Sequence, residues 1–162
     1  FKSRDMRIKM MRIGIDPGGS GSMSIISTAN NGDESMDIIR FKKLTEHDLH
    51  SIVKETLSVD CPKFCVIEKV HAMPMNGSIA NFKLGYSFGM LKSLLIENKI
   101  PFEEKIPSVW MKYFGMKKGK NKSSTEWKNE LKGKAQQFYP KHKVTLDMAD
   151  SMLVARYCQL NY

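Results

Sequence analysis

Apolar and polar positions alternate in the first quarter of the chain, which predicts strands joined by turns. Residues 11–16 have this alternation, and the run is broken where Asp16 precedes Pro-Gly-Gly. Apolar stretches at 22–27 and 36–41 predict two more strands, with an Asn-Asn-Gly-Asp turn at 30–33 between them. Three consecutive strands with short connections predict a meander.

Helical spacing of apolar residues dominates the rest of the chain, interrupted by two short strand-like runs. The dense apolar run at 64–67 is typical of a buried strand, and 100–106 predicts a fifth strand. Thr45 and Ser78 are placed to cap the first two helices. The predicted helices cover 45–57, 78–98, 125–139 and 146–159, with a helical turn at 110–114. This order predicts an α/β domain with a mixed sheet.

Length and composition narrow the class of protein. The 162 residues fit one domain, predicted over 11–162, with residues 1–10 read as a leader or added extension. No apolar run is long enough to cross a membrane, and three cysteines without a CxxC pair favour a reducing, cytoplasmic location. The formal net charge of +9 points to a polyanionic partner.

Four carboxylates lie at the ends of predicted elements and are the candidates for chemistry. Asp16 ends the first strand, Glu68 ends the fourth, and Asp147 and Asp150 share one face of the last helix. If the first and fourth strands are neighbours, these side chains converge. Such a cluster stays ionised only beside a cation, and hard oxygen ligands favour Mg²⁺ or Mn²⁺.

Each carboxylate also has a structural explanation. Asp16 could be a turn residue, Glu68 could pair with a lysine, and Asp147 suits the first turn of a helix, where the dipole favours an anion. Asp150 fits such an explanation least well, because its helix face is apolar and an unpaired buried carboxylate is costly. Taken together, the four favour a metal site.

Three short segments carry a resemblance to a known family. They are Gly14-Ile15-Asp16-Pro17-Gly18, Val66-Ile67-Glu68-Lys69-Val70 and Asp147-Met148-Ala149-Asp150-Ser151, in this order along the chain. The chain resembles the crossover-junction endodeoxyribonucleases of the RuvC-like family, particularly its shorter phage and viral members. The resemblance runs from about residue 11 to residue 157.

The resemblance implies an RNase H-like fold and a homodimer that nicks four-way (Holliday) DNA junctions in pairs and leaves 5′-phosphates. It makes Asp16, Glu68, Asp147 and Asp150 the ligands of two Mg²⁺ ions per active site, with Mn²⁺ able to substitute. Gly85 and Gly89 on the long helix fit the family's helix after the glutamate strand and imply close approach across the dimer; packing within one subunit is the alternative. A phage-encoded member would work in the cytoplasm of its bacterial host.

One position departs from the bacterial pattern, and one basic residue of the family has several possible counterparts in this chain. Bacterial members often carry an aromatic wedge three residues after the glutamate, where this chain has His71, which either contacts DNA or is an ordinary loop residue. The family also places a basic residue near the site on the helix before the last one. Lys128 is the best match, and Lys122 and Lys132 are alternatives.

A basic segment supports DNA binding independently of the resemblance. Residues 112–143 contain ten lysines and only two acidic residues, interleaved with aromatic residues. Lysines neutralise phosphates without reading sequence. In the loop before the fourth helix, the candidates for phosphate contact are Lys117, Lys118 and Lys120.

Other functions remain open at this point. An RNase H-like nuclease acting on flaps, forks or RNA–DNA hybrids would use the same metal chemistry. A non-catalytic nucleic-acid binder would gain nothing from four carboxylates, which repel DNA. The Asp16–Ser22 segment faintly resembles a phosphate loop of sugar kinases and actin, but those proteins need two such domains.

Overall fold

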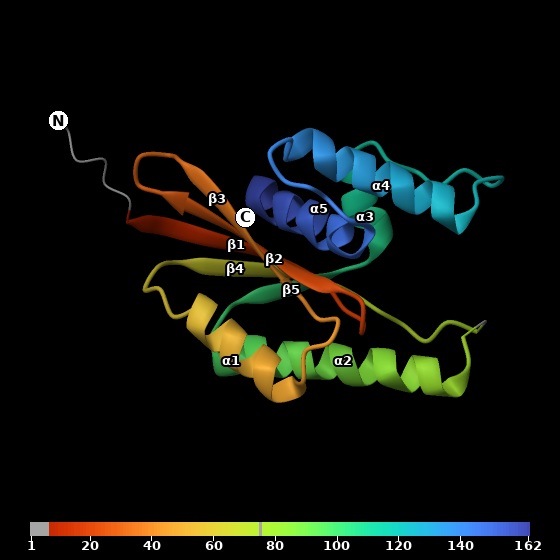
Figure 1. The fold of residues 1–162 in the computed structure, drawn as a ribbon, viewed down its shortest axis with the longest axis horizontal. Coiled ribbons are helices and arrows are strands. Elements are labelled where there is room, and N and C mark those ends of the chain that lie inside the picture. Colours follow the sequence, from red (N-terminus) through yellow and green to blue (C-terminus); the bar gives the residue numbers. More distant parts are fainter. Residues whose placement is uncertain (1–6, 75) are drawn as a thin grey trace.

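A five-stranded mixed sheet lies between two layers of helices (Figure 1). The computed structural model describes residues 7–74 and 76–162. The strands are β1 (Ile8–Asp16), β2 (Ser22–Ala29), β3 (Glu34–Arg40), β4 (Lys63–Glu68) and β5 (Phe102–Lys105). The helices are α1 (Glu46–Thr56), α2 (Ser78–Glu97), α3 (Pro107–Tyr113), α4 (Ser124–Phe138) and α5 (Leu146–Asn161).

The strand order β3-β2-β1-β4-β5 places the first strand at the centre of the sheet. The predicted meander is confirmed, because β1, β2 and β3 pair antiparallel in sequence order. Strands β4 and β5 then join in parallel, each after a connection that contains a helix. This is the arrangement expected when parallel neighbours need crossover helices.

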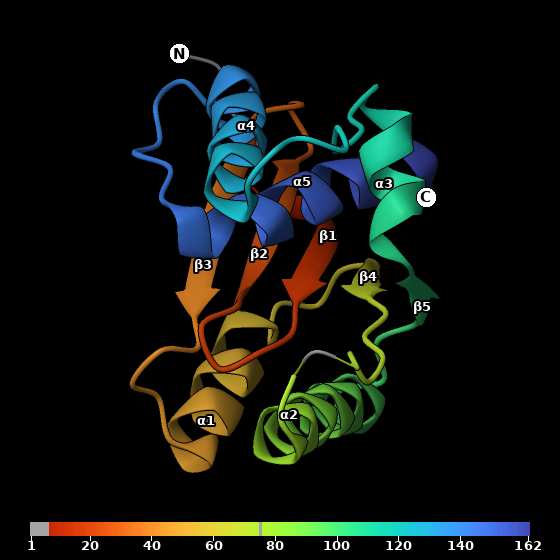
Figure 2. The same ribbon diagram turned by 90° about the vertical axis from the view of Figure 1, so that its right-hand side faces the viewer.

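The two faces of the sheet carry separate hydrophobic cores. Helices α1 and α2 cover one face, and α3, α4 and α5 cover the other (Figure 2). The first core includes Ile13, Ile15 and Leu91, and the second includes Val66, Trp110 and Leu153. All six side chains are completely buried. No helix in the described part of the chain is long and apolar enough to cross a membrane.

Most element boundaries lie close to the predicted ones, and the differences are mainly at element starts. Helix α3 begins at Pro107, before the helical turn predicted at 110–114, and β3 begins at Glu34, before the strand predicted at 36–41. Strand β1 begins at Ile8, upstream of the predicted domain start at residue 11, and Ile8 pairs with Ala29. Residues 1–6 of the predicted leader lie outside the described residues. Thr45 caps α1 in a capping box with Asp48, as predicted. The N-cap of α2 is Gly77 and not Ser78, so the predicted serine cap is wrong.

Candidate active site

Asp16 and Glu68 lie side by side at one end of the sheet. Strands β1 and β4 pair in parallel with Ile15 opposite Ile67, so both strands run out toward the same edge. Each carboxylate is the last residue of its strand. The convergence predicted for neighbouring first and fourth strands is therefore present, because the carboxyl ends of parallel strands meet at one edge.

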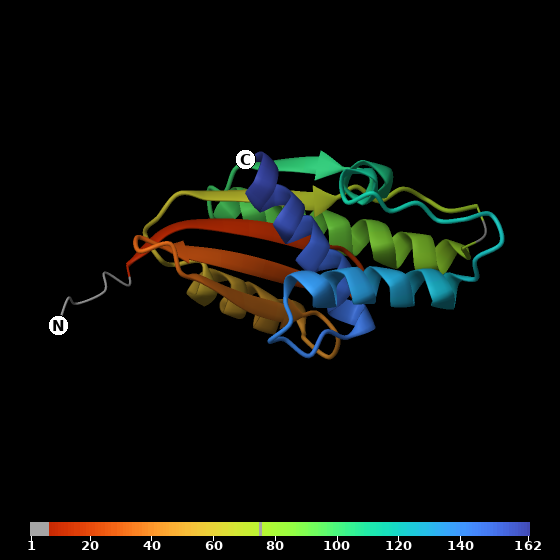
Figure 3. The same cartoon turned by 90° about the horizontal axis from the view of Figure 1, so that it is seen from above.

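Helix α5 brings Asp150 to the same place, because glycine allows it to pack tightly on β1. A Cβ atom on Gly14 would lie 2.1 Å from the backbone nitrogen of Ala155 and 2.5 Å from the carbonyl oxygen of Ser151. No side chain fits there, so the helix axis passes directly over the strand. The N-terminal turns of α5 thus reach the edge of the sheet where β1 ends (Figure 3).

A buried serine cluster fixes the start of α5 against β2. The hydroxyl groups of Ser22 and Ser24 each lie 2.7 Å from the Ser151 hydroxyl, and Ser22 Oγ donates to the carbonyl oxygen of Asp147 at 2.8 Å. All three serines are buried. Buried hydroxyl groups need partners, so this network holds the helix in a single register relative to the sheet.

Three carboxyl groups at this edge interact electrostatically. Burial, followed by the nearby charges of Asp150 and Glu68, raises the pKa of Asp16 well above its usual value. Burial, and then Asp150, raise the pKa of Glu68 to about 7. Burial also raises the pKa of Asp150 to about 6, against the opposing effect of Lys128. Carboxyl groups that share a site repel one another when ionised, so burial and this repulsion together favour their neutral forms.

Lys128 is the basic residue next to this cluster. Its charge acts to lower the pKa of both Asp16 and Asp150. The side chain comes from α4 and is exposed. Of the three lysines that the sequence left as candidates, the charge effects on the carboxylates therefore favour Lys128.

Asp147 makes its contacts with Thr145 and Arg40. Thr145 Oγ1 donates to its Oδ1 oxygen, and Arg40 Nη1 lies 3.4 Å from Oδ2. On balance these contacts lower the pKa of Asp147 although burial acts the other way. Its carboxylate is ion-paired with Arg40, and none of the other three carboxylates is among the charges that shift its pKa.

The donor set suits a divalent cation in chemistry but is not preformed. Carboxylate oxygens are the ligands that Mg²⁺ and Mn²⁺ prefer, and a divalent cation would offset the repulsion among three partly buried carboxylates. Within residues 7–74 and 76–162, no three His, Cys, Asp or Glu side chains form a ready metal-binding group. Metal binding would therefore involve a rearrangement of these side chains.

The predicted DNA contacts lie in exposed loops. Lys117, Lys118 and Lys120 are exposed in the loop between α3 and α4, and His71 is exposed in the loop after β4. Figure 2 shows the N-terminal ends of α2 and α4 on opposite sides of the end of β1.

The two alternative lysines on this side are less exposed. Lys132 is partly exposed on α4. Lys122 Nζ forms an ion pair with Glu130 at 2.6 Å and lies 5.9 Å from the centre of the Trp127 ring. Its charge is therefore partly used within the protein, unlike that of the exposed loop lysines.

Sequence reasoning missed two residues that contact the carboxylates. Trp110 is completely buried on α3, and its indole Nε1 donates to Glu68 Oε2 at 3.0 Å. Arg40 ends β3 and pairs with Asp147. Both are far from their partners in sequence. The only available signal was the presence of a tryptophan in the helical turn predicted after the fifth strand.

The candidate interface glycines lie on an uncovered part of α2. Apart from the neighbouring backbone of α2 itself, a Cβ atom on Gly85 or Gly89 would meet no atom within 4 Å in the part of the chain that the structure describes. Close packing within the subunit therefore does not explain either glycine. Nearby, Ile79 and Phe82 are 73% and 74% exposed, and Tyr86 is 52% exposed. This half of the helix extends beyond the sheet and carries apolar side chains into solvent.

Comparison with known proteins identifies the fold. The sequence matches no protein-family model and no curated protein. The structure is similar to RuvC of Thermus thermophilus in complex with a Holliday junction substrate, with a TM-score of 0.62 and 14% identity over 94% of this chain and 96% of that chain. A second Thermus thermophilus RuvC structure has a TM-score of 0.60 and 15% identity, covering 90% and 91% of the two chains. The chain therefore has the RNase H-like fold of RuvC, as its three carboxylate segments implied.

Proposed function

We propose that this chain is a metal-dependent endodeoxyribonuclease that resolves four-way DNA junctions by paired, symmetric nicks. The observation that carries the proposal is the meeting of Asp16, Glu68 and Asp150 beside Lys128 at one edge of the sheet. A structural role does not explain this cluster, because placing three carboxyl groups together raises their pKa values and destabilises the fold. The similarity to a RuvC structure that holds a Holliday junction supports the substrate class.

The residues at the edge of the sheet would have different roles in phosphodiester hydrolysis. When bound, two Mg²⁺ ions, or Mn²⁺ in their place, would supply an activated water and offset charge on the leaving 3′ oxygen. Asp16, Glu68 and Asp150 would hold the ions, and Asp147 would join them after leaving Arg40. Lys128 would stabilise negative charge on the phosphate, and the product would carry a 5′-phosphate.

The lysines of the loop between α3 and α4 would bind the substrate, and a dimer would pair two active sites. The exposed loop lysines Lys117, Lys118 and Lys120, with Lys122 and Lys132 at the edge of this surface, would neutralise backbone phosphates. His71 would contact DNA from the opposite side of the site. A homodimer through the uncovered half of α2, around Gly85 and Gly89, would give two active sites for cuts in opposed strands.

The direct test is cleavage of a labelled immobile four-way junction beside linear duplex, a flap and an RNA–DNA hybrid. Each substrate is incubated with Mg²⁺, Mn²⁺ or EDTA, and Asp16→Asn is the matched inactive variant. Symmetric nicks at the junction that require metal and are lost in the variant are expected. Cleavage of the hybrid or flap alone would retain the metal chemistry and replace the substrate. Junction binding with no cleavage of any substrate would reject the nuclease.

A further inference from the structure

Arg40 lies in the same row of the sheet as one of the proposed metal ligands. It ends β3 and is paired with Ser22 on β2, and Ser22 is paired in turn with Asp16 at the end of β1. Two strand spacings therefore separate the Cα atoms of Arg40 and Asp16, which is about 10 Å. Residues directly opposite one another share a face of the sheet. Ser22 Oγ contacts Ser151 on α5, so Arg40 and Asp16 also face α5.

The backbone at Arg40 is fixed, whereas its guanidinium is not. The next residue, Phe41, is buried, and its backbone N–H donates to the carbonyl oxygen of Gly21 at 3.0 Å. The Arg40 side chain is 54% exposed. Within residues 7–74 and 76–162, its guanidinium makes one hydrogen bond, from Nη1 to Asp147 Oδ2 at 3.4 Å. A guanidinium has five N–H donors, so the others remain available to a second partner.

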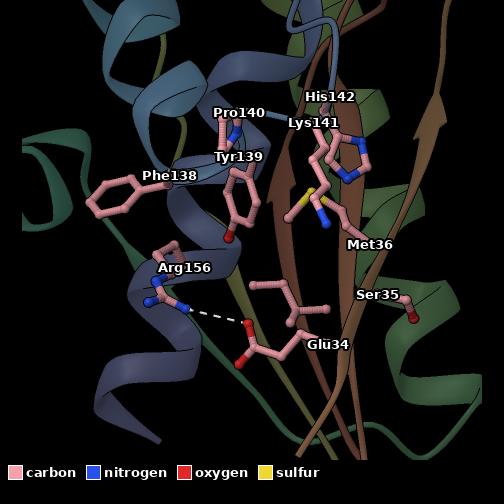
Figure 4. Close-up of a pocket in the computed structure, with 10 residues that line it drawn as sticks. Glu34, Ser35, Met36, Phe138, Tyr139, Pro140, Lys141, His142 and Arg156 are labelled. Carbon is pink, nitrogen blue, oxygen red and sulfur yellow. Dashed lines mark ion pairs between the residues drawn. The ribbon is translucent and has the colours of Figure 1, made fainter.

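Another ion pair between β3 and α5 shows how an arginine with a structural role is held. Arg156 on α5 lies 3.7 Å from Glu34 at the start of β3 (Figure 4). Its Nη1 also donates to Gln159 Oε1 at 2.6 Å, and its guanidinium carbon is 5.8 Å from the centre of the Phe138 ring. In the part of the chain that the structure describes, Arg40 has neither a ring contact nor a second acceptor. Its ion pair therefore adds little to the stability of the fold.

The carboxylate of Asp147 is also held by contacts that can be exchanged. Ser22 Oγ donates to the backbone carbonyl oxygen of Asp147 at 2.8 Å, which fixes the first turn of α5. The carboxylate itself accepts from Thr145 Oγ1 and from Arg40, and the side chain is 26% exposed. Ion pairs that are open to solvent contribute little free energy, so a divalent cation that binds Asp147 can displace Arg40 easily.

Each member of this ion pair has a better partner in a complex with metal and DNA. Carboxylate oxygens are preferred ligands of Mg²⁺ and Mn²⁺. The planar fork of an arginine binds a phosphate through two parallel N–H···O bonds, which a lysine ammonium does not match. The phosphate contacts proposed above are lysines, apart from His71. An arginine at the end of β3 is therefore a different kind of contact, on another strand.

We propose that Arg40 couples metal binding to DNA binding. Asp147 exchanges Arg40 for a metal ion, and the released guanidinium binds a backbone phosphate of the junction on the β3 side of the site. In the metal-free protein, Asp147 occupies Arg40 and repels that phosphate. Such coupling is reciprocal, so DNA raises the affinity for metal by the same factor as metal raises the affinity for DNA. The inference rests on the proposed nuclease and names the residue that links its two ligands.

The first test is calorimetric titration of the DNA-free protein with Mn²⁺. Arg40→Gln removes the competitor for Asp147 and should raise the Mn²⁺ affinity by about two- to fivefold. Lys42→Gln is the matched control, because Lys42 is exposed two residues further along the chain and the ion pair of Asp147 is with Arg40. The control removes the same charge and should have a clearly smaller effect. An equal gain in both variants would mean that net charge governs metal binding, and it would overturn the exchange.

The second test compares junction binding in EDTA and in Ca²⁺, which takes the same oxygen ligands. The ratio of the two affinities measures the coupling between metal and DNA. Arg40→Gln should reduce this ratio about three- to tenfold, because it removes a phosphate contact that forms only when metal is bound. Lys42→Gln should leave the ratio unchanged, whatever it does to the two affinities. An unchanged ratio in Arg40→Gln would overturn the proposal.

Failure of the coupling and failure of the nuclease give different results. Junction cleavage by the parent, with the same ratio in Arg40→Gln, rejects the role of Arg40 and leaves the proposed function standing. A reduced ratio in Arg40→Gln without cleavage of any DNA by the parent rejects the nuclease alone. A parent protein that binds no Mn²⁺ overturns both, because Asp147 then has nothing to exchange for Arg40.

Discussion

The indole Nε1 of Trp110 donates a hydrogen bond to Oε2 of Glu68 at 3.0 Å. Trp110 is completely buried in the core beneath α3, so the position of its N–H group is set by packing. The bond acts to lower the pKa of Glu68, although burial and Asp150 outweigh it. It also fixes one carboxylate oxygen and leaves the other free. Trp110 is therefore a positioning residue for the proposed metal ligand.

Replacing Trp110 with Phe should weaken metal binding more than it weakens the fold. The ring remains, but Glu68 loses the donor that orients it, and losses of this kind cost about 10–100-fold in metal affinity. Calorimetric titration with Mn²⁺ and the metal concentration that gives half-maximal cleavage would both measure the change. Trp127→Phe is the matched control, since Trp127 is buried in the same core on α4. Equal metal affinity in the two variants would contradict the positioning role.

Asp16→Asn should stabilise the metal-free protein while it abolishes cleavage. When the pKa of a carboxyl group is higher in the folded state than in the unfolded state, the fold becomes more stable as the pH falls from the folded-state pKa toward the unfolded-state pKa. With Glu68 at about 7 and Asp150 at about 6, the metal-free protein should become more stable as the pH falls from above 7 toward 5. At about pH 8 the variant removes one repelling charge, which is worth on the order of 1–3 kcal/mol.

Thermal unfolding in EDTA at several pH values would measure this effect. The advantage of Asp16→Asn should shrink as the pH falls, because the carboxyl groups of the parent then become neutral. Asp37→Asn, which changes an exposed carboxylate on β3, should show no such gain. Destabilisation by Asp16→Asn at about pH 8 would mean that the three carboxylates do not repel one another as their burial implies.

Neutralising Lys117, Lys118 and Lys120 together should weaken junction binding and flatten its salt dependence. If all three contact phosphates, the slope of log affinity against log salt should fall by about 2–3. Binding is measured in EDTA across a salt series. The control neutralises Lys9, Lys54 and Lys99, which are also exposed. It removes the same net charge from other parts of the surface. A similar loss in both triple variants would mean that net charge matters and the loop does not.

Gly14→Ala should be severely destabilising although it adds only one methyl group. Its Cβ would lie 2.1 Å from the backbone of α5, and backbone cannot move aside as a flexible side chain does, so we expect a loss of roughly 3 kcal/mol or more. Gly133→Ala on α4 is the counterpart, since no atom lies within 4 Å of its Cβ, and it should stabilise by about 0.4–1 kcal/mol. Urea unfolding of both would check the sign as well as the size of each change.

The parent protein should sediment as a dimer, and Phe82→Glu should shift it to monomer. Phe82 is 74% exposed, next to the uncovered Gly85. Placing a charge in an apolar interface commonly weakens association by more than about tenfold. Leu160→Glu, at the exposed end of α5, should leave the dimer intact. A parent protein that is monomeric at micromolar concentration would remove the proposed interface.

The local patterns of the sequence were sufficient for the elements and for the candidate ligands. Period-two and helical spacings are properties of neighbouring residues, so they gave the order of strands and helices and placed Asp16 and Glu68 at strand ends. The Thr45 cap was predictable because its partner Asp48 is three residues away. The serine cap on α2 was not, because Gly77 and Ser78 are both acceptable N-cap residues by local rules.

Contacts between distant segments could be decided only by the tertiary structure. The bond from Trp110 to Glu68 and the pairing of Arg40 with Asp147 each join residues far apart in sequence, and no local rule predicts them. The cluster of Ser22, Ser24 and Ser151 has the same origin. The sequence by itself determined which groups can carry the chemistry, because residue types and spacings are local. The fold determined which of them meet, because burial, repulsion and hydrogen bonding depend on distances that exist only after α5 has packed across β1.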